Sequence, residues 1–288
     1  MDELTSLVPQ RVTADMNEIL DRPYTAEEVR VALFQMAPSK APGVDGFTAG
    51  FFQRHWSWRK DDIVPAVLDF LNGGELPSGI NDTSITLIPK VRFPQSITQY
   101  RPISLCPVLY KIASKAIANR LREFLDDIIS VEQSAFVPGR LITDNVLIAH
   151  ESVHAMRRRK KGGNVVCAIK LDMMKAYDRV EWHYLQAIML KLGFCMEFVR
   201  LVMKCVTSVR FSVKCNGEQS EFFTPTRGLR QGDPLSPYLF LFVADGLVNL
   251  LNREVAGGHI TPIKVTRNSP GISNLLFADD ILISSRVR

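Results

Sequence analysis

The stretch Ile272-Ser-Asn-Leu-Leu-Phe-Ala-Asp-Asp-Ile-Leu-Ile283 places two adjacent carboxylates, Asp279 and Asp280, between two apolar runs. Runs of this length and composition predict a β-hairpin whose turn carries both acids. Two interpretations of the pair stay open. It can be an ordinary acidic turn, because aspartate is common in turns. It can also bind a divalent cation, because neighbouring carboxylates in apolar surroundings repel each other and lose solvation unless a cation neutralises them.

A third carboxylate, Asp172, follows another buried β-type run, Val165–Leu171. We expect the ends of these two strands to lie side by side, which would bring Asp172 next to the pair. Carboxylates on neighbouring strands can hold two divalent ions about 3.5–4 Å apart, as in two-metal phosphoryl transfer. Mg²⁺ suits such oxygen ligands best, and Mn²⁺ is a possible substitute. Asp178 and Asp233 could compete for this role, although Asp178 better suits a helix cap.

Composition excludes several classes of protein. The chain has 288 residues, of which 46% are hydrophobic, and 35 Lys+Arg against 30 Asp+Glu give a net charge of +5. This balance fits an ordered globular protein and permits a polyanionic partner. The five cysteines form no C-x-x-C pair, so we expect reduced thiols. With no signal peptide and no apolar run long enough for a bilayer, we expect an intracellular protein, nuclear or cytoplasmic, without a membrane partner.

Periodicity predicts mixed secondary structure. Thr25 and Glu28 have capping-box spacing ahead of a helix, and Asn216-Gly217 predicts a hairpin. Other helices are expected over 47–56, 63–71, 108–129, 143–156, 182–192, 196–206 and from about 237 to 251, and a further strand over 85–88. Strands and helices mixed in this way, with hairpins, indicate an α+β fold.

Seven stretches of the chain resemble, in one order, the reverse transcriptases of LINE-type (non-long-terminal-repeat) retrotransposons, particularly those of plants. They are Ala41-Pro-Gly-Val-Asp-Gly46, Leu87-Ile-Pro-Lys90, Tyr100-Arg-Pro-Ile-Ser-Leu105, Gln133-Ser-Ala-Phe-Val-Pro-Gly-Arg140, Leu171-Asp-Met-Met-Lys-Ala-Tyr-Asp-Arg-Val180, Arg227-Gly-Leu-Arg-Gln-Gly-Asp-Pro-Leu-Ser-Pro237 and Phe277-Ala-Asp-Asp280.

The resemblance implies a role for each matching residue. Asp172, Asp279 and Asp280 match the catalytic metal ligands, and Tyr177 matches the aromatic gate that excludes a ribose 2′-hydroxyl, although ordinary core packing would also account for a tyrosine there. The remaining matches concern the incoming nucleotide. Lys90 and Arg101 match the residues that hold its triphosphate, a task for which Arg forks and Lys charges are suited, and Gln231 and Gly232 match the loop beneath the templating base.

The resemblance also implies a fold and an activity. We expect the fingers and palm of a right-hand polymerase without its thumb: a lead segment over 1–24, fingers over 25–163, and a palm over 164–288 that stops shortly after the Asp-Asp hairpin. The expected reaction is RNA-directed DNA synthesis, with an RNA template, a DNA primer and deoxynucleoside triphosphates as partners. No protein partner is indicated. The chain would be a truncated copy, so a catalytically inactive nucleic-acid-binding remnant is an alternative, and an organellar intron maturase is a more closely related one.

Two further motifs have competing interpretations. The cationic run Arg157, Arg158, Arg159, Lys160 and Lys161 can contact nucleic-acid phosphates or can be a solvated helix end. The stretch His150-Glu-Ser-Val-His154 matches the H-E-x-x-H pattern of zinc hydrolases. No third ligand motif follows it, so an exposed helical face is the better interpretation.

Overall fold

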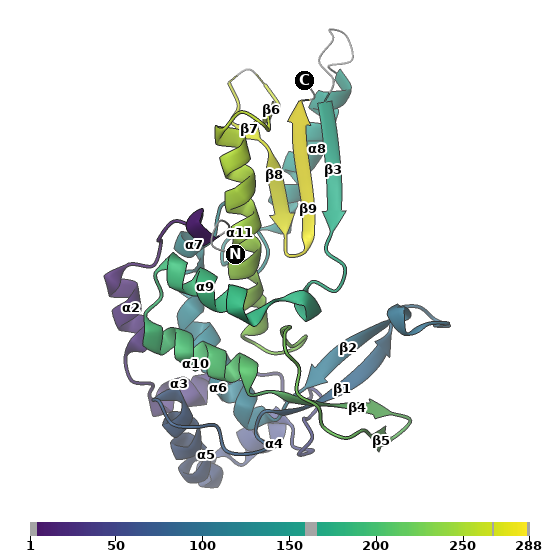
Figure 1. Cartoon of the computed structure of the whole chain (residues 1–288). Coiled ribbons are helices and arrows are strands. Elements are labelled where there is room, and N and C mark those ends of the chain that lie inside the picture. The colour runs from purple at the N-terminus through teal and green to yellow at the C-terminus, as the bar shows by residue number, and fades with distance from the viewer. Residues whose placement is uncertain (1–4, 159–165, 267, 287–288) are drawn as a thin grey trace.

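The hairpin predicted around Asp279 and Asp280 is present in the structure, a computed structural model that describes residues 5–158, 166–266 and 268–286. Its turn does not carry both acids, because Ala278 and Asp279 form the turn and Asp280 is the first residue of the next strand. Strands β8 (Asn274–Phe277) and β9 (Asp280–Arg286) pair antiparallel. Strand β3 (Val166–Asp172) pairs with the other edge of β9, which gives the order β3-β9-β8. Figure 1 shows this sheet in the upper part of the molecule, with the β8–β9 turn at its lower end.

A second sheet lies in the lower part. Its order is β2-β1-β4-β5, and its strands are β1 (Asp82–Pro89), β2 (Tyr100–Leu105), β4 (Arg210–Cys215) and β5 (Glu218–Gln219). The predicted hairpin at Asn216-Gly217 is confirmed, since both residues have the positive φ that its tight turn requires. Because β1 pairs in parallel with β4, this sheet joins segments more than a hundred residues apart in the chain. A short pair, β6 (Ile263–Lys264) and β7 (Gly271–Ile272), completes the strands described.

Helices make up most of the rest of the described structure. In chain order they are α2 (Ala14–Asp21), α3 (Ala26–Phe34), α4 (Ala49–Arg54), α5 (Trp56–Leu71), the 3-10 turn η1 (Ile97–Gln99), α6 (Val108–Arg122), α7 (Leu125–Ile128), α8 (Ile142–Arg158), the 3-10 turn η2 (Tyr177–Arg179), α9 (Trp182–Leu192), α10 (Met196–Thr207) and α11 (Ser236–Ala256). The mixed architecture confirms the α+β prediction. No helix in the described part of the chain is long and apolar enough to cross a lipid bilayer.

Most helices begin and end close to their predicted positions, and two predictions were wrong. The capping box at Thr25 and Glu28 is present, and α9 has the predicted bounds. The single helix expected over 108–129 is instead divided into α6 and α7. The helix expected at 63–71 begins at Trp56 and continues through Pro65.

One buried cation connects the N-terminal segment to α6. Arg120 is 3% exposed and forms an ion pair with Glu28 at 2.7 Å. Its guanidinium also donates to the backbone oxygens of Leu20, Arg22 and Pro23 and lies over the Tyr24 ring. Every donor of this buried charge therefore has an acceptor or an aromatic face, which offsets the cost of burying it.

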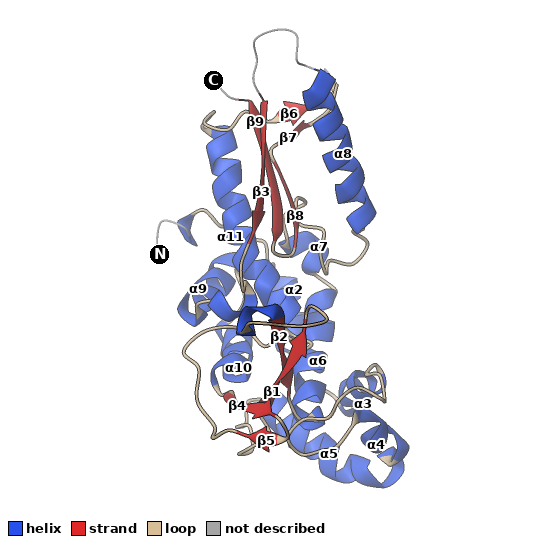
Figure 2. Ribbon diagram, turned by 90° about the vertical axis from the view of Figure 1, so that its right-hand side faces the viewer, coloured by secondary structure: helices blue, strands red, loops and turns tan. Residues whose placement is uncertain are grey.

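The upper sheet is covered unevenly. Seen edge-on in Figure 2, α11 and α8 lie on opposite sides of it. Val248 of α11 packs on Leu276 and Ile281. The prediction that β3 is a buried strand was wrong, because Ile169 and Leu171 are 48% and 40% exposed. The reason is position: β3 lies at one edge of the sheet, and the cluster on α11 includes residues of β8 and β9 but none of β3, whereas the segment around Gln133 covers the other edge, at β8.

Candidate active site

The register of the upper sheet brings two of the predicted carboxylates together. Asp172 is the last residue of β3 and Asp280 is the first of β9, and the two lie directly opposite each other. Side chains of directly opposed residues point to the same face of a sheet, with their Cβ atoms about 4.5–5.5 Å apart. Both side chains are exposed, so the two carboxylates form an accessible pair rather than the buried one that the apolar runs predicted.

The third carboxylate, Asp279, lies in the turn itself. Phe277 pairs with Asp280, so Ala278 and Asp279 form a two-residue loop. Ala278 has a φ of 55°, a conformation that two-residue hairpin turns require and that glycine adopts more easily. The backbone N–H of Met173, the residue after Asp172, donates to the Asp279 carbonyl at 3.4 Å. This bond ties the turn to the end of β3, so all three carboxylates lie at one end of the sheet.

A cation of the chain already lies beside these carboxylates. Lys170 Nζ is 2.9 Å from Asp280 Oδ1. The hydrogen bond to Asp280, together with the negative charges of Asp280 and Asp172, raises the pKa of Lys170. The carboxylates thus stabilise a positive charge at this position. This is the electrostatic property that a cation-binding site requires.

A cavity of about 520 Å³ opens next to the turn. Asp279 and Ala278 line one side of it, together with Tyr177, Gln231 and Gly232. The structure therefore brings one carboxylate, the predicted gate and the predicted loop to a single cavity. Lys40, Lys111, Lys115 and Phe136 are among the residues on its other walls.

Tyr177 is held by an aromatic stack. Its ring lies parallel to that of Phe240, with the ring centroids 5.0 Å apart and an angle of 9° between the planes. Burial, with a smaller effect from the Asp279 charge, raises the pKa of Tyr177 to about 12. The phenol therefore stays neutral at physiological pH, and it presents a fixed, bulky edge to the cavity beside Asp279.

The loop that carries Gln231 and Gly232 is anchored from below. Ser104 of β2 donates its N–H to the Gln231 carbonyl at 2.9 Å. Gly232 has a φ of 111° and a Cβ there would lie 3.2 Å from the Ser104 oxygen, so a larger residue would be strained in this place.

The flanking residues of this loop, Arg230 and Asp233, form a buried ion pair at 3.1 Å. The Tyr110 hydroxyl donates to the Asp233 carboxylate at 2.8 Å, and the Leu235 N–H donates to its other oxygen. Both carboxylate oxygens of Asp233 are therefore bonded within the protein, which favours a structural role for this residue over metal binding. Asp178 does not cap a helix either, because it lies within η2 and the N-cap of α9 is Glu181.

Lys90 and Arg101 lie together on the β1–β2 hairpin, apart from the cavity walls. Arg101 pairs with Ile88 in the ladder, and the Lys90 N–H donates to Gln99 across the hairpin. Both side chains are exposed. In Figure 1 the hairpin projects below the end of the upper sheet that carries the carboxylates.

The other predicted motifs lie farther along the upper part. Arg157 and Arg158 are exposed at the end of α8, whereas Arg159, Lys160 and Lys161 lie outside the described residues. His150 and His154 are exposed on the same helix. The described residues bring no third ligand to these two histidines, so the zinc-hydrolase interpretation gains no support.

Sequence reasoning missed the lysines of the cavity. Lys115 is partly buried, and burial, with the charges of Arg122 and Lys40, lowers its pKa. A signal was available, because residues 83–122 contain seven Lys and Arg and no Asp or Glu. The charged neighbours of Lys115 are thus cations, an arrangement that favours a bound anion.

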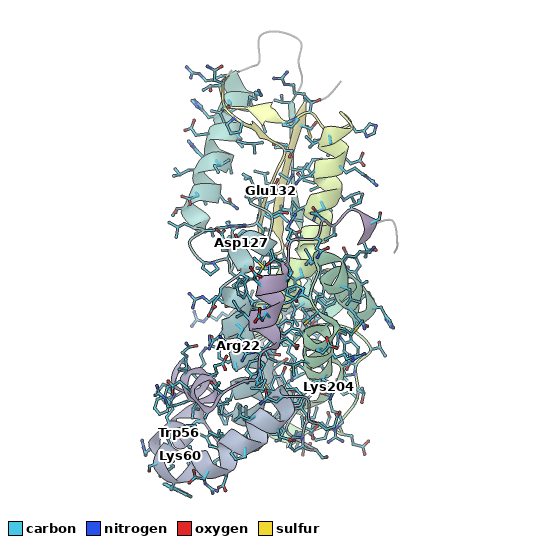
Figure 3. The ribbon with its side chains drawn as sticks, turned by 90° about the vertical axis from the view of Figure 1, so that its left-hand side faces the viewer. Arg22, Trp56, Lys60, Asp127, Glu132 and Lys204 are labelled. Carbon is cyan, nitrogen blue, oxygen red and sulfur yellow. The ribbon has the colours of Figure 1, made fainter. Side chains whose placement is uncertain are left out.

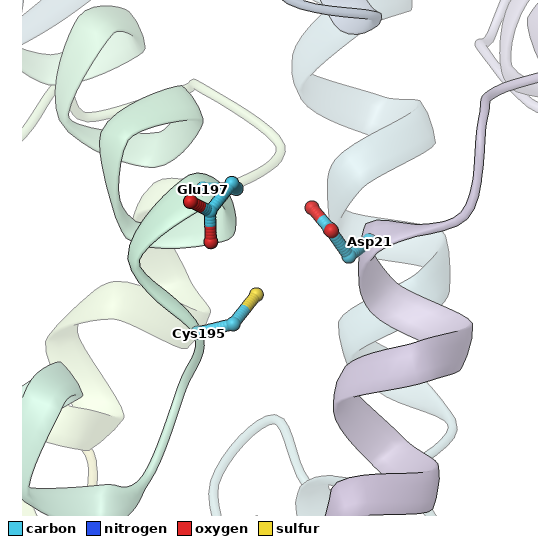
Figure 4. A group of neighbouring side chains, drawn as sticks. All are labelled: Asp21, Cys195 and Glu197. Atoms are coloured by element: carbon cyan, nitrogen blue, oxygen red, sulfur yellow. The ribbon is translucent and has the colours of Figure 1, made fainter.

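Elsewhere, one group of possible metal ligands joins α2 to α10. Asp21, Cys195 and Glu197 point toward one another, with their ligand atoms within 4.8 Å (Figure 4). Both carboxylates are exposed. Burial raises the pKa of Cys195, which favours the thiol over the metal-binding thiolate. This group lies outside the cavity beside Asp279.

The family model for reverse transcriptase (RNA-dependent DNA polymerase) matches residues 88–288, and the chain therefore belongs to the reverse transcriptase family. It is 32% identical, over 94% of its length, to the transposon TX1 uncharacterized 149 kDa protein of Xenopus laevis. It is 29% identical, over 91% of its length, to the Pol polyprotein of the type-1 retrotransposable element R2 of Popillia japonica.

A further relative is the RNA-directed DNA polymerase from the mobile element jockey of Drosophila melanogaster, which is 27% identical over 82% of the chain. These relatives place the chain in the LINE-type, non-long-terminal-repeat branch, as the sequence motifs predicted. The chain spans 20%, 35% and 27% of the lengths of the TX1, R2 and jockey proteins, respectively.

The Lys170–Asp280 contact predicts how the site responds to a divalent cation. A metal ion bound by Asp280 and Asp172 would meet repulsion from the Lys170 ammonium, so Lys170→Met should tighten Mn²⁺ binding, by about threefold to tenfold at low salt. Titration of the protein with Mn²⁺, followed by electron paramagnetic resonance, measures this. Lys60→Met removes the same charge from α5, at the far end of the molecule (Figure 3), and should change nothing. Equal affinities for wild type and Lys170→Met would contradict the assignment.

Proposed function

We propose that this chain carries the nucleotidyl-transfer site of an RNA-directed DNA polymerase, with the carboxylates Asp172, Asp279 and Asp280 at its centre. The observation that supports this best is the register of β3 and β9, which sets Asp172 opposite Asp280, beside a cavity that Asp279 lines. The reaction is attack of a primer 3′-hydroxyl on the α-phosphate of a deoxynucleoside triphosphate, with release of pyrophosphate. One relative, from the mobile element jockey, is an RNA-directed DNA polymerase.

The donor set suits divalent cations. Three carboxylates at one sheet end, two of them exposed, offer hard oxygen ligands of the kind Mg²⁺ prefers. When bound there, Mg²⁺ would lower the pKa of the attacking hydroxyl and stabilise the leaving oxygen. The protein contributes positioning and electrostatics, because phosphoryl-type transfer requires little covalent chemistry from side chains.

The cavity beside Asp279 is the proposed place of the incoming nucleotide. Tyr177, fixed by its stack on Phe240, would exclude a ribose 2′-hydroxyl by its bulk. Gln231 and Gly232 would lie beneath the base pair being formed, where glycine permits close approach of the backbone. Lys90 and Arg101 would reach the triphosphate from the β1–β2 hairpin if the hairpin closes over the cavity.

The template strand is proposed to follow a cationic face of α6. Lys111, Lys115 and Arg122 are spaced four and seven residues apart, so the three cations share one face of the helix. They span about 16 Å along the axis. That is longer than one triphosphate and matches several successive phosphates of a strand. The cationic run Arg157 to Lys161 is proposed as a further contact with nucleic-acid phosphates.

The division into fingers (25–163) and palm (164–288), without a thumb, also remains a proposal. The sheets suggest a refinement of it. Strand β4 pairs with β1, and β5 pairs with β4, so both would belong to the fingers, whereas α8 packs on β8 and would belong to the palm.

Primer extension tests the proposed function. We expect the protein to extend a DNA primer on an RNA template with deoxynucleotides and Mg²⁺, and Asp279→Asn to reduce the rate by at least about a thousandfold. Asp178→Asn, a matched change in an acid outside the proposed site, should leave the rate within about twofold. Extension that survives Asp279→Asn would disprove the site. Duplex binding without any extension by the wild type would indicate a nucleic-acid-binding protein instead.

The α6 cations predict a salt-dependent contact. The double variant Lys111→Gln, Lys115→Gln should weaken binding of single-stranded RNA and reduce the slope of log affinity against log salt by about 1.4, or 0.7 per lost phosphate contact. Lys60→Gln with Lys191→Gln removes the same charge from α5 and α9 and should leave the slope unchanged. If the double variant instead raises KM for the nucleotide at unchanged RNA affinity, the lysines serve the triphosphate and the template path is wrong.

A further inference from the structure

We propose that Gln133 is a positioning residue for the catalytic carboxylates, acting through the turn formed by Ala278 and Asp279. This inference rests on the proposed function, because it gives Gln133 a task in that site. Gln133 comes from the loop after α7, nearly 150 residues before the turn in the chain, and its side chain is almost completely buried, at 1% exposure.

The Gln133 amide bonds to both backbone polar groups of one residue. The Ala278 N–H donates to Gln133 Oε1 at 2.9 Å, and Gln133 Nε2 donates to the Ala278 carbonyl at 3.4 Å. Oε1 also accepts the N–H of Ala135 at 3.0 Å, which fixes the orientation of the amide. The Gln133 side chain therefore supplies the hydrogen bonds that the buried Ala278 N–H and carbonyl would otherwise need from water.

The turn needs such support because of its backbone conformation. Ala278 has a φ of 55°, and a non-glycine residue in this region costs about 1–3 kcal/mol unless its surroundings impose it. Ala278 is buried and Asp279 is the next residue. Any relaxation of Ala278 would therefore redirect the Asp279 carboxylate, and loss of support around a metal ligand typically costs about 10–100-fold in affinity or activity.

Gln133 is itself held in place. Leu276 donates its N–H to the Glu132 carbonyl and accepts the Ser134 N–H, so the segment around Gln133 runs along the outer edge of β8. Arg140 donates to the Gln133 carbonyl at 2.7 Å. Figure 3 shows Glu132 beside the strands, between α8 and α11, and its side chain accepts a hydrogen bond from Asn252 of α11. The support for the turn is thus part of the rigid frame of the upper sheet.

The Gln133→Met variant tests this role, because methionine keeps the length of the side chain and loses all three hydrogen bonds. A matched control is Asn145→Leu. The Asn145 amide donates to the Leu276 carbonyl at 2.8 Å, so it supports the same hairpin away from the turn. Three properties are compared in both variants: hydrogen exchange of the Ala278 amide, Mn²⁺ affinity without nucleic acid, and the kcat and KM of primer extension.

If Gln133 positions the turn, the Ala278 amide hydrogen exchanges at least tenfold faster in Gln133→Met than in wild type. The variant also binds Mn²⁺ about tenfold more weakly. It also lowers kcat more than it changes KM for the nucleotide, and Asn145→Leu shows none of these effects. Equal behaviour of the two variants at equal folded fraction would overturn the proposal. If Gln133→Met does not fold, Gln133→Asn keeps a neutral amide but shortens the side chain by one methylene group, which takes the amide out of reach of Ala278, and unchanged exchange and Mn²⁺ affinity there would overturn the proposal as well.

The exchange and Mn²⁺ measurements do not depend on polymerisation. A wild-type protein that fails to extend a primer would count against the proposed function, whereas hydrogen exchange and Mn²⁺ affinity would still decide whether Gln133 orients the turn.

Discussion

The antiparallel register of β3 and β9 is the constraint on which the proposed active site depends. It sets Asp172 opposite Asp280, and a slip of one residue would turn every β3 side chain to the other face of the sheet. The end of β3 is held in this register by Met173, the residue after Asp172, which packs against Val248, Leu276 and Ile281 and donates its N–H to the Asp279 carbonyl. The carboxylates therefore lie at the exposed end of a sheet that packs against α11 on one face.

The cavity depends in turn on two buried polar arrangements in the lower part. Arg230 and Asp233 pair beneath the Gln231–Gly232 loop, and Arg120 joins α6 to the N-terminal segment. Buried ion pairs add little net stability, and removing one partner is costly because it leaves a charge unpaired. We interpret these pairs as devices that fix the geometry of α6 and of the loop, since both elements form walls of the cavity.

Much of this arrangement could be predicted from short-range patterns. The Asp-Asp hairpin, the Thr25 capping box and the Asn216-Gly217 turn each follow from the local chemistry of a few residues, and the order of motifs identified the family. The exposure of β3 could not be predicted, because an apolar run looks the same at the edge of a sheet as at its centre. Gln133 lies in one of the stretches that match the family, but its contact with Ala278 could not be predicted, because the two residues are 145 positions apart in the chain. The lysines of the cavity could have been found from the acid-free stretch before Glu123.

The most direct measurement of the central claim is the position of divalent ions in a complex of this protein with an RNA template, a DNA primer and a non-reactive nucleotide analogue. Anomalous diffraction from crystals grown with Mn²⁺ would locate them. The proposed geometry predicts two peaks about 3.5–4 Å apart, bound by Asp172, Asp279 and Asp280 and next to the nucleotide phosphates. Peaks that avoid these carboxylates while the nucleotide occupies the cavity would contradict the account.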